Sequence, residues 1–332
     1  MEIRVLLMKV FFVTAVTDLN IAEPLGRGDR LDDSTYITNN FSAFEKYMTP
    51  VFVAVTGRLD SDFIRKSRTA IFGVEELPEE ANIQEYLVAK MVKLSTLLRS
   101  LWLIKDNSVN HDVVFAAYTR SGVDHVDSNH WRTRTSAASG QHSSVTFTRK
   151  ELAQARRLFR ERFEPAGVVK AGSASTIQVV GRFERVFYFI DGARKEADLS
   201  LKITNYCSAL ESAFATQSAE LTHVLSERVA VFLEDHPGPR LELYRDIKKA
   251  YGIRSVVVHG GGHKPSKLDD LLSSSIKLDD VLRRVVMALL SSPIQRILLD
   301  LPGDELDEYM LRRIFGASWE DFVERETNSQ DD

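Results

Sequence analysis

Residues 251–263, YGIRSVVVHGGGH, decide how the C-terminal part of the chain folds. Taken alone, the three consecutive valines favour a strand, because β-branched residues fit a pleated surface. The preceding residues instead place apolar side chains at helical spacing on one stripe: Leu243, Ile247, Ala250 and Val257. A helix over residues 240–259 that ends at the glycines is consistent with both observations.

Arg254 falls within this apolar stripe when the residues are arranged at about 100 degrees per residue. A buried guanidinium group without a partner costs several kcal/mol, so it must meet a carboxylate or face an interface that admits an anion. The spacing does not by itself bring His259 to Arg254. Two interpretations remain open: a buried ion pair with His259 capping the helix C-terminus, or an anion site formed by both residues.

Three segments together resemble a known superfamily: CSALESAF at 207–214, LSERVAVFL at 225–233 and IRSVVVHGG at 253–261. Their order and spacing are similar to those of the HEPN superfamily, in particular its Apea-like branch. Arg254, Ser255 and His259 match the superfamily's arginine, polar residue and histidine. The resemblance covers about residues 178–290, and residues 1–150 carry none.

The resemblance implies a metal-independent endoribonuclease that cleaves RNA by attack of the 2′-hydroxyl on the adjacent phosphate. Its expected products are a 2′,3′-cyclic phosphate and a free 5′-hydroxyl. The expected catalytic residues are His259 for proton transfer, Arg254 for the charge on the phosphate, and Glu211, which pairs with Arg254 or orients the site. HEPN domains usually dimerise so that two such sites share a cleft, and we therefore expect a homodimer.

Four further residues are candidates for RNA binding: Ser255, Tyr251, Arg228 and His263. Tyr251 could stack on a base, and Arg228 could hold a second phosphate. The alternatives are a buried ion pair for Arg228 and, for Glu211, an ordinary place on a helix surface. GGGH at 260–263 follows a helix instead of leading into one, so the helix dipole has the wrong sign to bind phosphate there.

The expected role is that of an antiviral defence, abortive-infection or toxin-like effector in the cytoplasm, held in check by an antitoxin or a defence-complex partner. The alternative is a non-catalytic HEPN module for dimerisation and RNA binding. No cofactor or metal is expected. A polar loop does collect potential metal ligands, but their spacing fits no helix-borne pair: Asp124, His125, Asp127, His130 and His142.

Composition limits the choice of partners. The 332 residues carry a net charge of −4, so nucleic acid would have to contact a local basic patch. Candidates are Arg156, Arg157, Arg160 and Arg162, or Arg283 and Arg284, although for each group taken alone the pattern favours a solvated helix face. The single cysteine, Cys207, excludes an intrachain disulfide, and no apolar run is long enough to span a bilayer.

The expected fold class is α+β, with a mixed sheet domain over 1–148 that senses a trigger or positions the substrate, an all-α HEPN helical bundle over 149–324 and a disordered tail over 325–332. Strands are expected at 3–19, 50–56, 113–119 and in VTFT at 145–148, with a long helix at 82–105. A capping box at Thr148 predicts the next helix. The remaining helices are expected at 178–195, 198–215, 219–235, 240–259, 266–273, 277–291 and 304–315.

Overall fold

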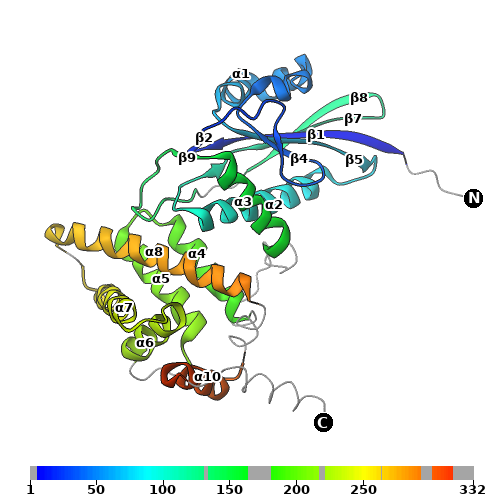
Figure 1. Cartoon of the computed structure of the whole chain (residues 1–332). Coiled ribbons are helices and arrows are strands. Elements are labelled where there is room, and N and C mark those ends of the chain that lie inside the picture. Colours follow the sequence, from blue (N-terminus) through cyan, green and yellow to red (C-terminus); the bar gives the residue numbers. More distant parts are fainter. Residues whose placement is uncertain are drawn as a thin grey trace, which may run out of the picture. The chain divides into compact units, whose positions relative to one another are not determined.

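The computed structural model describes residues 6–130, 134–163, 181–216, 221–262, 264–292 and 301–316 (Figure 1). The chain divides into two compact units. The first comprises Met1–Ala137 and His142–Ser173, and the second comprises Ala138–Gln141 and Ala174–Asp332. The expected boundary at 148/149 is therefore too early. The expected tail at 325–332 lies outside the described residues.

The first unit is built on an antiparallel sheet. Its strands, in spatial order, are β3 (Asp29–Arg30), β4 (Thr35–Thr38), β5 (Ala70–Pro78), β1 (Leu7–Thr17), β7 (Val114–Arg120) and β8 (Val123–Asn129), with β6 (Asn110–His111) pairing to β1. Each described pair in this sheet is antiparallel, which corrects the expected mixed sheet. The parallel pair of β2 (Leu19–Ile21) and β9 (Val145–Phe147) stands apart from it.

Two segments differ from their predicted structure. The expected strand at 50–56 lies in helix α1 (Pro50–Lys66), because Thr49 accepts a hydrogen bond from the Phe52 amide and Pro50 occupies the first turn. The expected polar loop after residue 120 instead contains β8, an edge strand whose polar side chains alternate across the sheet. The strands β3, β4 and β5 were not predicted.

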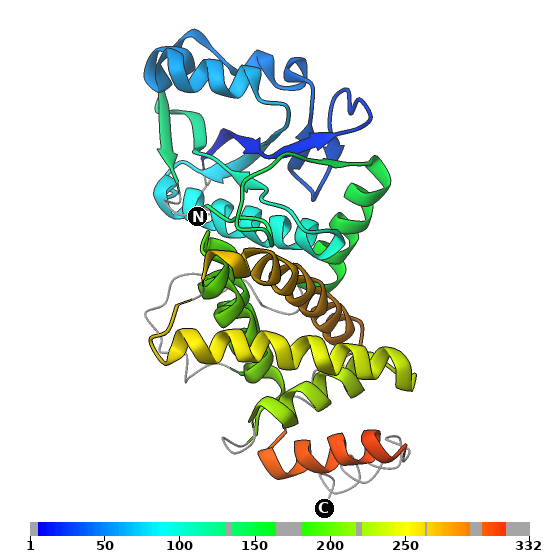
Figure 2. The ribbon, with the colours of Figure 1, turned by 90° about the vertical axis from the view of Figure 1, so that its left-hand side faces the viewer.

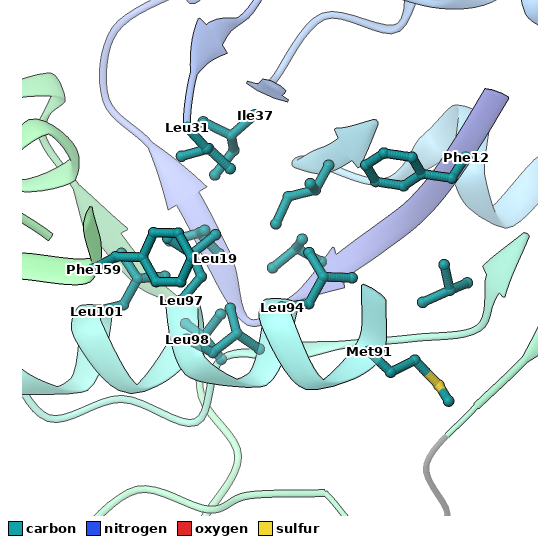
Figure 3. Close-up of a cluster of buried hydrophobic side chains, with 14 of the residues drawn as sticks. Phe12, Leu19, Leu31, Ile37, Met91, Leu94, Leu97, Leu98, Leu101 and Phe159 are labelled. Carbon is teal, nitrogen blue, oxygen red and sulfur yellow. The ribbon is translucent and has the colours of Figure 1, made fainter. Parts of the chain in front are cut away.

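The sheet separates two hydrophobic cores because β1 buries both of its faces. Val10 and Phe12 point to one side, towards α2 (Ile83–Ile104), whereas Phe11 and Val13 point to the other. Figure 3 shows the first core, in which Leu94, Leu97 and Leu101 of α2 meet side chains from the sheet. Helix α3 (Arg149–Leu158) packs on α2, which explains its place in the first unit.

The described part of the second unit is helical. Its helices are α4 (Arg182–Lys195), α5 (Leu199–Phe214), α6 (Leu221–Leu233), α7 (Pro237–Val258), α8 (Leu268–Ser291) and α10 (Gly303–Phe315). Helix α5 packs against α4, α6, α7 and α8 and so lies at the centre of the unit (Figure 2). The two helices expected at 266–273 and 277–291 form one helix, α8. Its serines do not interrupt it, since Ser274 and Ser275 are buried and Ser275 donates a hydrogen bond to the Ala138 carbonyl.

The sheet unit followed by a helical unit confirms the α+β class. Within the described ranges, no helix combines the length and the apolar character that crossing a bilayer requires.

A substitution at Gly73 of β5 would test how tightly the sheet is packed. A Cβ atom at this position would lie 2.2 Å from the Ser34 carbonyl oxygen and 2.5 Å from the Phe12 ring. Gly73→Ala must therefore displace backbone, and we expect it to lower the free energy of unfolding by about 3 kcal/mol. The measurement is urea unfolding followed by the fluorescence of the buried Trp102.

The matched control is Gly252→Ala in α7, where an added Cβ atom meets nothing within 4 Å. This variant should be as stable as the wild type, or more stable by up to about 1 kcal/mol, because alanine favours helix interiors. A wild-type unfolding curve for Gly73→Ala would contradict the packing described for β5.

Candidate active site

Helix α7 buries one face against α5 and α6 and exposes the other. Leu243, Ile247, Ala250 and Tyr251 are its buried residues, which confirms the predicted apolar stripe as far as Tyr251. Val258 lies off this stripe and is 53% exposed. The helix begins at Pro237, a residue that fits the first turn because it lacks the amide hydrogen that would go unbonded there.

The glycine run ends α7 with a Schellman motif. The Gly260 amide donates to the Val257 carbonyl at 3.0 Å, and the Gly261 amide donates to the Val256 carbonyl at 2.8 Å. Gly260 has a φ of 77°, a conformation that favours glycine. His259 is the C-cap residue, so the predicted helix and its glycine stop are both confirmed.

Arg254 pairs with Glu211 of α5. Its Nη2 atom lies 3.0 Å from Glu211 Oε1 and donates a hydrogen bond to Oε2 at 3.3 Å. The two side chains are 24% and 19% exposed, so the pair is mostly withdrawn from water. The predicted pairing of these residues is confirmed, and Glu211 is not an ordinary surface glutamate.

Burial raises the pKa of the Glu211 carboxyl group, although the positive charge of Arg254 acts to lower it. The buried thiol of Cys207, one turn earlier on α5, also has a raised pKa because of burial and of the nearby Glu211 charge. Arg254 Nε is buried and has no hydrogen-bond partner among the described residues. A buried donor left unpaired is uncommon in a native structure and is a feature that a bound anion would explain.

Tyr251 does not serve as a stacking platform for a base. Its side chain is buried, at 4% exposure, and its ring lies 5.1 Å from the Arg254 guanidinium carbon. The ring therefore covers Arg254 from within the helical unit, which corrects the predicted contact with RNA.

His259 and Ser255 are exposed at the end of α7. The Ser255 carbonyl accepts a hydrogen bond from the His259 amide at 3.2 Å. Arg254 and His259 both lie in the last turns of α7. Among the described contacts, none joins the imidazole to the guanidinium group. The imidazole is open to solvent and to a ligand.

Arg228 is a structural residue and not an RNA-binding one. It is 8% exposed and donates hydrogen bonds to the Phe214 carbonyl at 2.7 Å and to Thr216 Oγ1 at 3.0 Å. It also forms an ion pair of 2.5 Å with Asp307 of α10. The alternative interpretation, a buried ion pair, is the one that the structure confirms.

A hollow of about 390 Å³ lies beside the end of α7. Aliphatic side chains of α5, α7 and α8 and a few polar groups line it: Leu201, Val257, Leu268, Leu271, Asp198, Ser200, Lys264, Gly261 and Gly262. No local sequence pattern indicates this hollow, because its walls come from three helices that are distant in sequence. The size is sufficient for a small organic group such as a nucleobase.

The other candidates lie elsewhere. His263 is outside the described residues. Asp124 accepts a hydrogen bond from Thr119, and Asp127 accepts one from Tyr118. Across the described ranges, no three His, Cys, Asp or Glu side chains are grouped so that they could hold a metal ion.

Comparisons of the chain with protein-family models, with curated proteins and with solved structures gave no significant match.

Tyr251→Phe tests whether the buried hydroxyl of this tyrosine contributes to stability. The Tyr251 hydroxyl is buried without a hydrogen-bond partner in the described part of the chain. Its removal should leave the free energy of unfolding unchanged or raise it by up to about 1 kcal/mol, because an unpaired polar group disappears. Thermal unfolding followed by helical circular dichroism measures this effect. A loss of more than about 2 kcal/mol would mean that the hydroxyl has a bonding partner.

Proposed function

We propose that the protein is a metal-independent endoribonuclease of HEPN type, with Arg254, His259 and Glu211 as its site. The observation that carries the proposal is the state of Arg254. Its guanidinium is held in an apolar helix face by Glu211, its Nε donor is unpaired among the described residues, and 24% of the side chain remains exposed. The exposed part of the guanidinium can meet a phosphate while Glu211 keeps its orientation fixed.

In the proposed reaction, the RNA 2′-hydroxyl attacks the adjacent phosphorus atom and loses its proton to a neutral histidine. The bond from phosphorus to the 5′-oxygen breaks, and that oxygen takes up a proton. The products are a 2′,3′-cyclic phosphate and a 5′-hydroxyl. Arg254 stabilises the negative charge that grows on the non-bridging oxygens, and Glu211 fixes the orientation of the guanidinium.

The surface around His259 suits association with a second copy. Two apolar side chains are exposed beside Val257, around the hollow at the end of α7: Leu201 (46%) of α5 and Leu268 (58%) of α8. A homodimer through this surface would cover them and bring two His259 side chains to one cleft, one to remove a proton and the other to supply one.

We further propose a role as an antiviral defence, abortive-infection or toxin-like effector in the cytoplasm, restrained by an antitoxin or a defence-complex partner. An RNA-cleaving enzyme needs such restraint because its substrate is present throughout the cell. The alternative function is a HEPN module that dimerises and binds RNA without cleaving it. The same exposed apolar surface supports that alternative.

The decisive variant for catalysis is His259→Ala. We expect the native protein to cleave labelled RNA in EDTA and to leave cyclic-phosphate ends. His259→Ala should reduce the rate about 100-fold or more, the usual size of a general acid–base contribution. Arg254→Lys, which keeps the charge beside Glu211 but loses the planar fork, should also reduce the rate about 100-fold. Gel analysis of end-labelled RNA with assignment of the termini measures both effects.

His236→Ala is the matched control, because His236 is an exposed histidine at the other end of α7 whose side chain makes no capping hydrogen bond. This variant should cleave at the native rate. Equal cleavage by His259→Ala would rule out the proposed site. Binding of RNA without any cleavage by the native protein would favour the non-catalytic module.

The proposed dimer depends on the exposed leucines beside the hollow. Leu201→Asp together with Leu268→Asp would place two carboxylates on the interface, and we expect the variant to be monomeric in light scattering after size-exclusion chromatography. Because both side chains point to solvent in one copy, the helical circular dichroism should not change. A native protein that is monomeric at about 100 μM would contradict this interface.

A further inference from the structure

The first unit carries a concentration of positive charge that the proposed catalytic site does not use. Residues 149–163 contain six cationic side chains, Arg149, Lys150, Arg156, Arg157, Arg160 and Arg162, and two anionic ones, Glu151 and Glu161. Their net charge of +4 contrasts with −4 for the whole chain. These residues form α3 and a π-helical turn, Phe159–Phe163, at its end.

The inner face of this segment is apolar and fixed. Leu152, Ala155, Phe159 and Phe163 are buried, and the first three of them belong to the core beneath α2. Lys150, Arg157 and Arg160 are exposed on the outer face, together with Arg162. The outer face also exposes the uncharged Ala153 and Gln154 and the acidic Glu161. We refer to Lys150, Arg157, Arg160 and Arg162 as the α3 cationic surface.

The helix under this surface is held by other contacts. Arg149 Nε donates to Asp29 Oδ2 at 2.9 Å, and Arg156 Nη1 donates to the Arg30 carbonyl at 2.8 Å. Glu151 closes the capping box with Thr148 and meets Lys105 at 2.7 Å. Arg149 and Arg156 therefore have structural partners within the first unit and are not part of the surface.

Two of the three arginines of the α3 cationic surface make long, exposed ion pairs. Arg157 lies 3.8 Å from Glu161, with side chains 71% and 59% exposed. Arg160 lies 3.9 Å from Asp33, with side chains 50% and 87% exposed. Exposed pairs of this length contribute between zero and about 1 kcal/mol, so an incoming phosphate can replace the carboxylate at little cost.

We propose that the α3 cationic surface binds the sugar–phosphate backbone of single-stranded RNA. The inference rests on the proposed function in one respect, that RNA is the ligand. Three of the four cations are arginines, and a planar guanidinium group can donate two parallel hydrogen bonds to phosphate oxygens. The absence of large apolar side chains among the exposed residues of α3 argues against a protein partner, since protein interfaces depend on aromatic and aliphatic anchors. Contacts to phosphates alone predict binding without sequence preference.

The test uses the His259→Ala protein, so that RNA is bound without being cleaved. Fluorescence anisotropy with a labelled single-stranded RNA of about 20 nucleotides gives the affinity between 50 and 200 mM NaCl. Adding Arg157→Glu and Arg160→Glu should weaken binding at least 10-fold at 50 mM NaCl. The slope of log K against log salt should fall by about 1.4, because each lost phosphate contact on a single strand accounts for about 0.7.

The control variant is Arg58→Glu with Lys66→Glu on α1 of the same unit. These two cations also form long, exposed pairs, at 3.9 and 3.8 Å from Asp62, so the change in charge and environment is matched. The control should bind RNA within about twofold of the parent protein. Equal losses in both variants would mean a general charge effect and would overturn the proposed surface.

Competition identifies the ligand chemistry. Single-stranded DNA of the same sequence should compete within a few-fold of RNA, since the contacts are to phosphates. Polyglutamate that competes as well as RNA would overturn the assignment to nucleic acid. If the native protein binds but does not cleave RNA, and Arg157→Glu with Arg160→Glu still abolishes binding, the α3 cationic surface stands while the catalytic proposal fails.

Discussion

The ion pair between Arg254 and Glu211 fixes how α7 lies against α5. A guanidinium among apolar side chains is tolerated only beside a carboxylate that is itself withdrawn from water, and at 3.0 Å the pair meets this condition. Once Arg254 is held there, the remaining four residues of α7 bring His259 to the end of the helix, where the Schellman motif of Gly260 and Gly261 ends it. The position of the candidate catalytic histidine thus follows from a contact made one and a half turns earlier.

Glu211 can play this role because α5 is itself held on several sides. Tyr206 donates a hydrogen bond to Asp279 of α8 at 2.9 Å, and Asp279 also pairs with Arg283. The buried Lys202 donates to the Ala193 carbonyl of α4 at 2.8 Å. These polar groups have partners, so they specify the neighbours of α5 more sharply than apolar packing alone. A helix that could rotate would not keep Glu211 opposite Arg254.

Local patterns predicted those parts of the structure in which a single element carries the signal. The helical stripe of Leu243, Ile247 and Ala250 and the glycines after His259 gave the correct helix and its end. The need to pair a buried arginine predicted a carboxylate partner, and the resemblance of the segment at 207–214 pointed to Glu211 as that partner. The strand predicted at 50–56 was wrong because the cap at Thr49 outweighs the β propensity of the valines.

The features that the sequence did not reveal depend on contacts between distant segments. Arg228 meets Asp307 across 79 positions, and nothing in the RVA segment indicates that partner. Burial of Tyr251, by contrast, could have been predicted from the sequence, because the residue stands four positions after Ile247 on the apolar stripe. The hollow beside Val257 needs α5 and α8 for its walls. Predicting such contacts requires the tertiary arrangement of helices that local periodicity leaves open.

Arg254 and the arginines of the α3 cationic surface differ in their exposure to water, and they would therefore hold an anion in different ways. Arg254 is 24% exposed and is already oriented by Glu211, so a phosphate that reaches it meets a guanidinium that loses little freedom on binding. Arg157 and Arg160 are at least half exposed and weakly paired, so they attract a polyanion over a distance but do not position it. Salt should therefore weaken recruitment at the α3 cationic surface much more than it weakens the contact with Arg254 once RNA is bound, because screening acts mainly on charges in water.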